Sequence, residues 1–295
     1  MQTVFIAGAT GYLGRHLCSE YRRRGWRVVA LVRDASAAQD LAADTLIEAE
    51  ATKPNTLAGV MEGADLLVSA LGITRQADGL GYWDVDYQAN LNLLIEAQRA
   101  GIRRFAYIHV LNARKMRHVP LVAAKSAFVS ALQDADIAST VIAPSGYFSD
   151  MADFLSAARF GRMWLFGSGA HKINPIHGAD LAAATADAIT ERRAWLDVGG
   201  PDVFSQSELT RAAFAAVGKP EKVTRLPDWL RRIVLRLLPR LTPRRIHGPA
   251  LFFLTAAGLD MVGTPFGTRK LIDHFKRLGA QPTASSPSKT MADQA

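Results

Sequence analysis

The chain has 295 residues, of which 49% are hydrophobic and 21% charged, and its formal net charge is +8. This composition is that of a globular protein and excludes a wholly disordered or collagen-like chain. The only cysteine, Cys18, excludes an intramolecular disulfide framework and a cysteine-based zinc site, and we expect no metal site. No basic segment precedes a long apolar run at the N-terminus, so we expect a cytoplasmic protein without a signal peptide.

The first half of the chain alternates short apolar runs with amphipathic stretches. The runs predict strands at 4–7, 28–32, 66–71, 105–110 and 140–143, with a weaker strand at 45–47. The stretches between them predict helices at 12–24, 57–62, 84–100 and 119–134. Continuous apolar strands separated by helices are typical of an α/β fold with a doubly wound parallel sheet, covered on both faces.

A glycine-rich loop joins the first expected strand to the first expected helix. In such a loop one glycine permits a tight turn, one lets the backbone approach a pyrophosphate, and one lets the helix pack against the sheet. The helix N-terminus adds a partial positive charge that favours phosphate. The loop therefore predicts a dinucleotide site, whose binding residues we expect to be Gly8, Thr10, Gly11, Tyr12, Leu13, Gly14 and Arg15.

The spacing Gly-x-x-Gly-x-x-Gly resembles that of extended and atypical members of the short-chain dehydrogenase/reductase superfamily. The resemblance continues over 1–226, through Arg33 at a strand end, Asn90, Lys125, the turn 144–148 and the segments 174–181 and 199–201. The nearest groups are the isoflavone reductases, the divinyl chlorophyllide reductases and NmrA-like regulators. The resemblance implies a Rossmann-like sheet with a smaller C-terminal substrate-facing region, built mostly after residue 144.

The end of the second expected strand bears on the choice of cofactor. An acidic residue there would bind the adenosine ribose and favour NAD, whereas a guanidinium can hold a 2′-phosphate. Arg33 occupies this strand end, with Arg15 near enough to help, so we favour NADP(H). If Asp34 and not Arg33 faces the ribose, NAD is the cofactor. Further along the chain, Ala70, Leu71, Gly72, Lys125 and Pro144 are also expected to contact the cofactor.

The catalytic positions implied by the resemblance depart from the superfamily pattern Tyr-x-x-x-Lys with an upstream Ser. Lys125 stands at the lysine position, but Leu121 replaces the tyrosine and His109 takes the place of the serine. We expect Lys125 to bind the ribose or act as the acid, the alternative being an ordinary surface lysine. His109 is either a proton donor or a packed neutral histidine. The glycine-containing segment 74–81 is either a loop over the site or a plain surface loop.

Two functions of different class follow from the resemblance. The first is an NADP(H)-dependent oxidoreductase that transfers hydride to a hydrophobic small-molecule carbonyl, quinone or conjugated alkene. The second is a non-catalytic NAD(P)-binding regulator or assembly protein of the NmrA-like or complex I-associated type, which the missing tyrosine favours. Turnover of the cofactor, as opposed to binding alone, discriminates between them.

The positive charge of the chain is concentrated in one segment. Residues 222–245 hold eight of the 35 Lys and Arg residues but one of the 27 Asp and Glu residues. We expect domain 1–226 to bind the cofactor, 227–280 to form a basic and apolar helical region, and 281–295 to be a disordered tail. Residues 222–245 fit peripheral contact with an anionic membrane, or a helix packed on the core with solvated arginines. No motif indicates specific nucleic-acid binding.

Overall fold

The computed structural model describes residues 1–73 and 79–280. Most of the predicted loop 74–81 and the predicted tail 281–295 lie outside the described residues. The described chain contains an eight-stranded sheet with the strand order β12-β9-β6-β5-β4-β1-β2-β3, in which every pair of neighbours is parallel. This arrangement confirms the predicted doubly wound, Rossmann-like α/β class.

Six of the eight strands of the main sheet fall close to the predicted strand runs, whereas β9 and β12 match none of them. The eight strands are β1 (Thr3–Ala7), β2 (Arg27–Val32), β3 (Thr45–Glu48), β4 (Leu66–Ser69), β5 (Arg104–Ile108), β6 (Ala138–Pro144), β9 (Trp195–Gly199) and β12 (Thr264–Pro265). Alternate residues of a strand enter different cores, as the pleat requires. In β1, Val4 and Ile6 belong to one buried cluster, while Phe5 and Ala7 belong to another.

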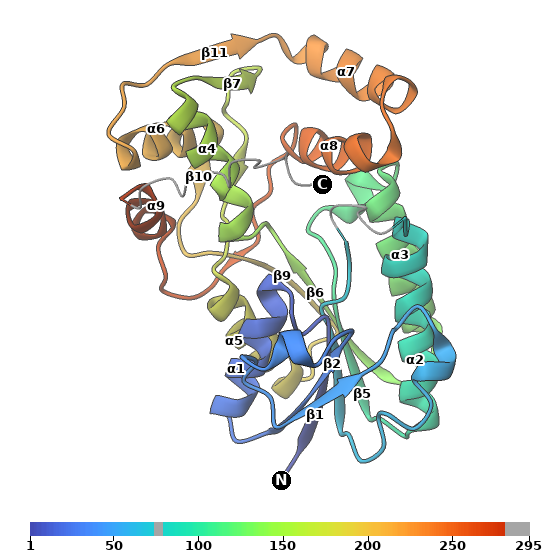
Figure 1. Ribbon diagram of the computed structural model, residues 1–295. Helices are drawn as coiled ribbons and strands as arrows, with labels where there is room; N and C mark the ends of the chain where they lie inside the picture. Colours follow the sequence, from blue (N-terminus) through green and yellow to red (C-terminus); the bar gives the residue numbers. More distant parts are fainter. Residues whose placement is uncertain (74–78, 281–295) are drawn as a thin grey trace, which may run out of the picture.

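Helices cover both faces of the sheet, as Figure 1 shows. One face packs against α1 (Tyr12–Arg23) and α5 (Gly178–Thr190), and the other against α2 (Asn90–Arg99) and α3 (Pro120–Asp134). A π-helical segment, Trp83–Ala89, leads directly into α2, where the sequence predicts a single helix over 84–100. A π-helical turn is wider than an α-helical turn, and such segments often occur at functional sites.

One predicted helix is absent. Residues 57–62 form successive turns instead of a helix. Gly59 lies inside this stretch with φ +80° and Gly63 follows it with φ +75°, both in the left-handed region. A left-handed residue breaks the repeating backbone conformation of a right-handed helix. The prediction of a helix over 57–62, which rested on an amphipathic pattern, is therefore wrong.

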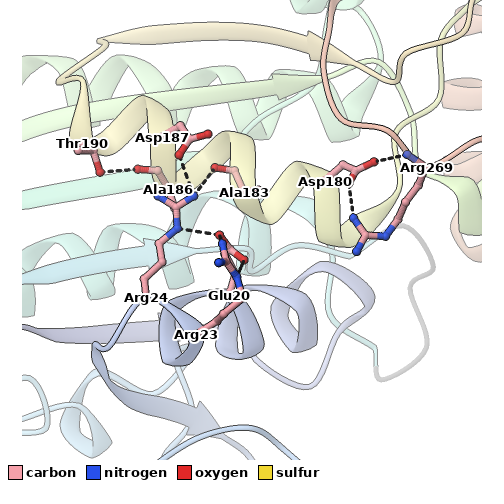
Figure 2. A network of polar contacts seen from close by, with 9 residues as sticks. All are labelled: Glu20, Arg23, Arg24, Asp180, Ala183, Ala186, Asp187, Thr190 and Arg269. Atoms are coloured by element: carbon pink, nitrogen blue, oxygen red, sulfur yellow. Dashed lines mark hydrogen bonds and ion pairs between the residues drawn. The ribbon is translucent and has the colours of Figure 1, made fainter.

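Polar contacts join α1 to α5 on one face of the sheet (Figure 2). Arg24 donates to Glu20 on its own helix and to Asp187 on α5, both at 2.7 Å. Burial alone would raise the pKa of Glu20, but the hydrogen bonds from Arg23 and Arg24 outweigh it and hold that pKa below its usual value. Near the start of α5, Arg269 donates to the buried Asp180. The contacts of Arg24 hold the end of α1, the helix that follows the glycine loop, against α5, and the contacts of Arg269 hold the start of α5.

A second, smaller assembly lies over the carboxyl edge of the sheet (Figure 1). Its strands are β7 (Met163–Phe166), β8 (Lys172–Ile173), β10 (Phe204–Ser205) and β11 (Val223–Leu226). Its helices are α4 (Ala152–Phe160), α6 (Gln206–Ala216), α7 (Asp228–Leu241), α8 (Arg244–Ala256) and α9 (Leu271–Gly279).

Residues on the two sides of the predicted boundary between 226 and 227 contact each other in the smaller assembly and in the main sheet. The apolar sides of α4, α6 and α9 share one core, which Leu155, Phe214 and Phe275 enter. In addition, β12 extends the main sheet by pairing with β9. The residues after 226 therefore contribute to the core of the smaller assembly and to the edge of the main sheet, as well as to the basic helical segment.

Candidate cofactor and active site

A cleft of about 700 Å³ lies between the main sheet and the smaller assembly. Glycine-loop residues line one part of it, and residues from α8 and β7 line another. Ligands of open α/β sheets bind in this position, outside the carboxyl ends of the strands. The structure brings ten of the predicted site residues together in the lining: Gly8, Gly11, Tyr12, Leu13, Gly14, Ala70, Gly72, His109, Lys125 and Pro144.

The glycine loop is built as its sequence predicts. Gly8 has φ +77°, and a Cβ there would lie 2.8 Å from the carbonyl carbon of Ala70. A Cβ on Gly14 would lie 2.0 Å from the carbonyl oxygen of Gly8. The N-cap of α1 is Gly11, which offers no side-chain cap, and the first turn contains no acidic residue. The first N–H groups of the helix therefore favour an anionic ligand such as a pyrophosphate.

Tyr12 joins this loop to α5 and to the turn after β6. Its hydroxyl accepts a hydrogen bond from the Gly178 N–H at the start of α5, at 3.0 Å. Its ring centroid lies 5.8 Å from that of Tyr147, which follows β6 and also lines the cleft. Burial raises the pKa of both phenols, so both are protonated near neutral pH.

Four predicted cofactor contacts are not part of the cleft lining among the described residues: Thr10, Arg15, Arg33 and Leu71. Arg15 donates to the carbonyl oxygen of Thr10 at 3.1 Å and to Asp40 at 2.6 Å. Leu71 packs against the core on the α2 and α3 face. Arg33 is exposed at the end of β2, and the neighbouring Asp34 accepts hydrogen bonds from the N–H groups of Ser36 and Ala37.

Lys125 projects from α3 into the cleft, where it meets a buried carboxylate. Its Nζ lies 3.2 Å from Asp86 Oδ1, 3.2 Å from the carbonyl oxygen of Ile108 and 3.4 Å from the Tyr107 hydroxyl. The side chain of Asp86 is 0% exposed and that of Lys125 is 14% exposed. Lys125 is therefore no ordinary surface lysine: its ammonium is held at the end of β5, facing the cleft.

Asp86 is a residue that the sequence analysis did not single out. It lies on the π-helical segment before α2, and its buried position raises its pKa, which the Lys125 ammonium only partly offsets. A Cβ on Gly72 would lie 2.6 Å from Asp86 Oδ1 and 3.0 Å from Lys125 Nζ, so this position must be glycine for the pair to form. The signal available in the sequence was an acidic residue four positions before Asn90.

Asn90 connects the π-helical segment to the end of β4 through hydrogen bonds of its side-chain amide. Its Nδ2 donates to the carbonyl oxygens of Val85 and Asp86, at 3.0 and 3.3 Å, and its Oδ1 accepts from the Ser69 hydroxyl at 2.6 Å. The amide thus joins the π-helical segment to the end of β4. Asn90 is fully buried and positions Asp86 without lining the cleft.

His109 lines the cleft directly after β5 but is only 5% exposed. Burial, with a contribution from the Lys125 ammonium, lowers its pKa to about 3. Its Nδ1 has no hydrogen-bond partner among the described residues, and its ring meets Trp195 edge-on at 5.8 Å. Near neutral pH this imidazole is therefore neutral: one ring nitrogen can accept a hydrogen bond and the other can donate one, but there is no imidazolium to deliver a proton.

The part of the cleft lined by β7 and α8 is mostly apolar, while Asp150, Asp153, His171 and Lys172 are charged or titratable residues that also line the cleft. Leu121 replaces the expected tyrosine and lines the cleft four positions before Lys125. The other apolar lining residues include Met151, Phe154, Met163, Trp164, Leu165, Phe166, Phe252, Phe253 and Met261. A pocket with such an apolar wall fits a flat or extended hydrophobic molecule.

Neither a metal-binding cluster nor a membrane-spanning helix occurs in the part of the chain that the structure describes. No group of three or more His, Cys, Asp or Glu residues is placed to hold a metal ion within 1–73 and 79–280. In the same part of the chain, no helix has the length and apolar character needed to cross a bilayer.

Curated relatives include both enzymes and assembly proteins. The chain is 25% identical to divinyl chlorophyllide a 8-vinyl-reductase of Arabidopsis thaliana, over 80% of this chain and 62% of that protein. It is 30% identical to the photosystem II assembly factor Ycf39 of Synechocystis, over 50% of this chain and 46% of that protein. A third relative, 24% identical, is the mitochondrial NADH dehydrogenase [ubiquinone] 1 alpha subcomplex subunit 9 of Arabidopsis thaliana, matched over 76% of this chain and 60% of that protein. The chain thus spans less than two thirds of each.

Solved structures share the fold. An NADPH-dependent quinone oxidoreductase of Escherichia coli, complexed with NADPH, superposes with a TM-score of 0.75 at 21% identity, covering 93% of this chain and 99% of that one. A UDP-glucose 4-epimerase of Thermus thermophilus in complex with NAD gives 0.64 at 18% identity, with 93% and 99% covered. The family model described as NAD(P)H-binding matches residues 8–192, from the glycine loop to the end of α5. The chain therefore belongs to the NAD(P)H-binding family, as an atypical member of the short-chain dehydrogenase/reductase superfamily.

Proposed function

We propose that this protein is an NADP(H)-dependent oxidoreductase that transfers hydride to a hydrophobic carbonyl, quinone or conjugated alkene. The observation that carries the proposal is the continuity of one cleft. It runs from the glycine loop, past the buried Lys125–Asp86 pair, to an apolar wall built by β7 and α8. A dinucleotide on the loop and an apolar acceptor at the wall would meet beside Lys125.

The preference for NADP(H) is supported by the end of β2. Arg33 is exposed there, where a guanidinium can bind a 2′-phosphate in a bidentate manner. Asp34, which would favour NAD if it faced the ribose, uses its carboxylate to accept from Ser36 and Ala37. The quinone oxidoreductase of the same fold was solved with NADPH, which agrees with this choice.

The bound nicotinamide would supply the hydride. This chain's own residues supply the polar group beside it, because Asp86 and the Ile108 carbonyl hold the Lys125 ammonium at the cleft. In the proposal, Lys125 binds the nicotinamide ribose or donates a hydrogen bond to the acceptor oxygen, stabilising the negative charge that develops there. His109 is neutral, so it does not act as the proton donor of this proposal; its ring can accept one hydrogen bond and donate one.

An acceptor panel tests the proposal. Purified protein is mixed with NADPH and, in turn, with short-chain quinones, aromatic aldehydes and conjugated enones, and loss of reduced-nicotinamide absorbance is followed. We expect turnover with at least one class and a loss of at least about a hundredfold in the Lys125→Met/Asp86→Asn variant, which removes both charges of the pair. Full activity in that variant would remove Lys125 from the mechanism.

A second candidate function rests on Leu121. An aliphatic side chain where the superfamily has its proton-donating tyrosine favours a non-catalytic NAD(P)-binding regulator or assembly protein. One of the relatives is named as an assembly factor and another as a subunit of a larger complex. This candidate predicts stoichiometric binding of NADPH with no oxidation by any acceptor of the panel. The two outcomes exclude one another.

A further inference from the structure

Helix α7 exposes a row of apolar side chains. Trp229, Ile233, Leu237 and Leu241 recur at every fourth position, on one side of the helix. Their exposed fractions are 59%, 41%, 44% and 74%, respectively. Aliphatic and aromatic side chains exposed singly are common in proteins, but a continuous row along a helix marks an interaction surface.

A row of arginines lies beside this apolar row. Arg232, Arg236 and Arg240 are also spaced by four residues and are exposed. The remaining side of α7 is turned inward, where Leu235 and Leu238 are partly covered and Arg231 is buried. The helix therefore has three strips: one against the protein, one cationic and one apolar, the last two both facing solvent.

The inward side of α7 is fixed by polar contacts, so the two outer strips have a defined orientation. Arg231 donates to Asp228 at 2.7 Å and to the Leu254 carbonyl oxygen of α8 at 2.9 Å. A Cβ on Gly258 would lie 2.4 Å from the Arg231 guanidinium, so the chain after α8 closes tightly over it. Figure 1 shows α7 across the end of the molecule farthest from the N-terminus, with α8 between it and α3.

We propose that the outer face of α7 docks the protein onto the surface of an anionic lipid bilayer. Charge and apolarity together select this occupant: arginines attract anionic headgroups, while Trp229, Ile233 and Leu237 insert at the level of the headgroups and upper acyl chains. A nucleic acid would explain the arginines but not the apolar row. A second copy of this chain would place two equally cationic faces against each other.

Docking in this orientation places the apolar wall of the cleft next to the bilayer. The first turn of α7 adjoins the end of β7, where a Cβ on Gly167 would lie 3.7 Å from Asp228 Cβ. Trp164 of β7 and Phe253 of α8 both line the cleft and are 57% and 40% exposed, so they form part of its apolar mouth. A lipophilic molecule could then pass from the bilayer into the cleft without crossing bulk water. The docking itself does not depend on the proposed hydride transfer.

Vesicle cosedimentation tests the proposal. The full-length protein is mixed with phosphatidylcholine vesicles, with and without phosphatidylglycerol, at low and at raised salt. We expect cosedimentation with the anionic vesicles, weakened by salt because exposed charges are screened within about 8 Å at physiological ionic strength. No cosedimentation with anionic vesicles at low salt would overturn the proposal.

Two triple variants measure the contributions of the cationic strip and the apolar strip separately. R232E/R236E/R240E should lose more than about tenfold in affinity for anionic vesicles, since each basic side chain near such a surface contributes a several-fold factor. W229S/I233S/L237S should lose at least about tenfold while keeping its salt dependence. Unchanged binding by either variant would overturn docking through this face.

A matched control carries the same charge change at the opposite end of the molecule. R22E/R27E/R103E replaces three exposed arginines near the amino ends of the strands, and it should bind anionic vesicles within about threefold of the unmodified chain. An equal loss in the control would show attraction by net charge alone and contradict the proposal. Sedimentation velocity without vesicles addresses the remaining occupant: a dimer dissociated by W229S/I233S/L237S would assign the face to a second copy and refute lipid docking.

Discussion

Replacing Lys125 with methionine removes the ammonium that faces a fully buried carboxylate. The two side chains are 14% and 0% exposed, so the energetics of a buried pair apply and not those of a surface pair. Breaking a buried pair by removing one partner costs about 3–5 kcal/mol, because the remaining charge is left uncompensated. We therefore expect Lys125→Met to lower the free energy of unfolding by about 3 kcal/mol at neutral pH.

The pH dependence of that loss identifies its cause. Burial already raises the pKa of Asp86 in the folded protein, and removing Lys125 raises it further. A carboxyl whose folded-state pKa lies above its unfolded value takes up a proton on folding, so stability falls as pH rises from about 4 through the folded-state pKa. The deficit of Lys125→Met should accordingly be small at acid pH and grow toward neutral pH.

Urea unfolding followed by circular dichroism at several pH values measures this loss. The double variant Lys125→Met/Asp86→Asn serves as the matched control, since a neutral amide beside a thioether carries no uncompensated charge. It should recover most of the lost stability and show little pH dependence. A deficit that is independent of pH, or a double variant as unstable as Lys125→Met, would refute the assignment of a coupled buried pair.

Three further predictions concern the glycine loop, the cofactor and the cysteine. Arg33→Ala should weaken NADPH binding by about 1.5–3 kcal/mol in calorimetric titration and NADH binding much less; equal losses would contradict a 2′-phosphate contact. Gly8→Ala places a Cβ 2.8 Å from the Ala70 carbonyl at a residue with φ +77°. It should therefore lower the free energy of unfolding by more than about 1 kcal/mol and abolish NADPH binding. An unchanged affinity for NADPH would contradict the close approach of the glycine loop to Ala70. Cys18 is 0% exposed and burial raises the pKa of its thiol to about 12, so iodoacetamide should label it only in denaturant; rapid labelling of the native protein would disprove its burial.

Periodicity and glycine spacing were sufficient to predict the parallel class of the sheet, six of its eight strands and the glycine loop, but not β9 and β12. Apolar runs such as 4–7 and 28–32 have to be buried on both faces, and only a parallel sheet with crossover helices provides this. The helix expected over 57–62 failed because Gly59 adopts a left-handed conformation, which an amphipathic pattern does not report. The amphipathic pattern of 84–100 likewise did not predict the π-helical start of this segment, because the pattern shows only which side of a helix is apolar.

The site was predicted less completely because its chemistry depends on pairs distant in sequence. Asp86 and Lys125 meet only when α3 packs beside the π-helical segment, so neither residue reveals the pair on its own. Arg15 illustrates the opposite case, in which proximity in sequence is misleading. It directly follows the glycine loop, but its guanidinium contacts Asp40. The apolar wall of the cleft is assembled from β7 and α8, which no local motif connects.

A single-turnover experiment tests the central claim most directly. The protein is loaded with one equivalent of NADPH and mixed in a stopped-flow instrument with the most reactive acceptor of the panel, and the absorbance of the reduced nicotinamide is followed. The account predicts a fast, complete loss of that absorbance in the unmodified chain, and a loss slower by at least about a hundredfold in Lys125→Met/Asp86→Asn. Bound NADPH that persists in the unmodified chain with every acceptor would contradict an oxidoreductase and leave a nucleotide-binding assembly protein.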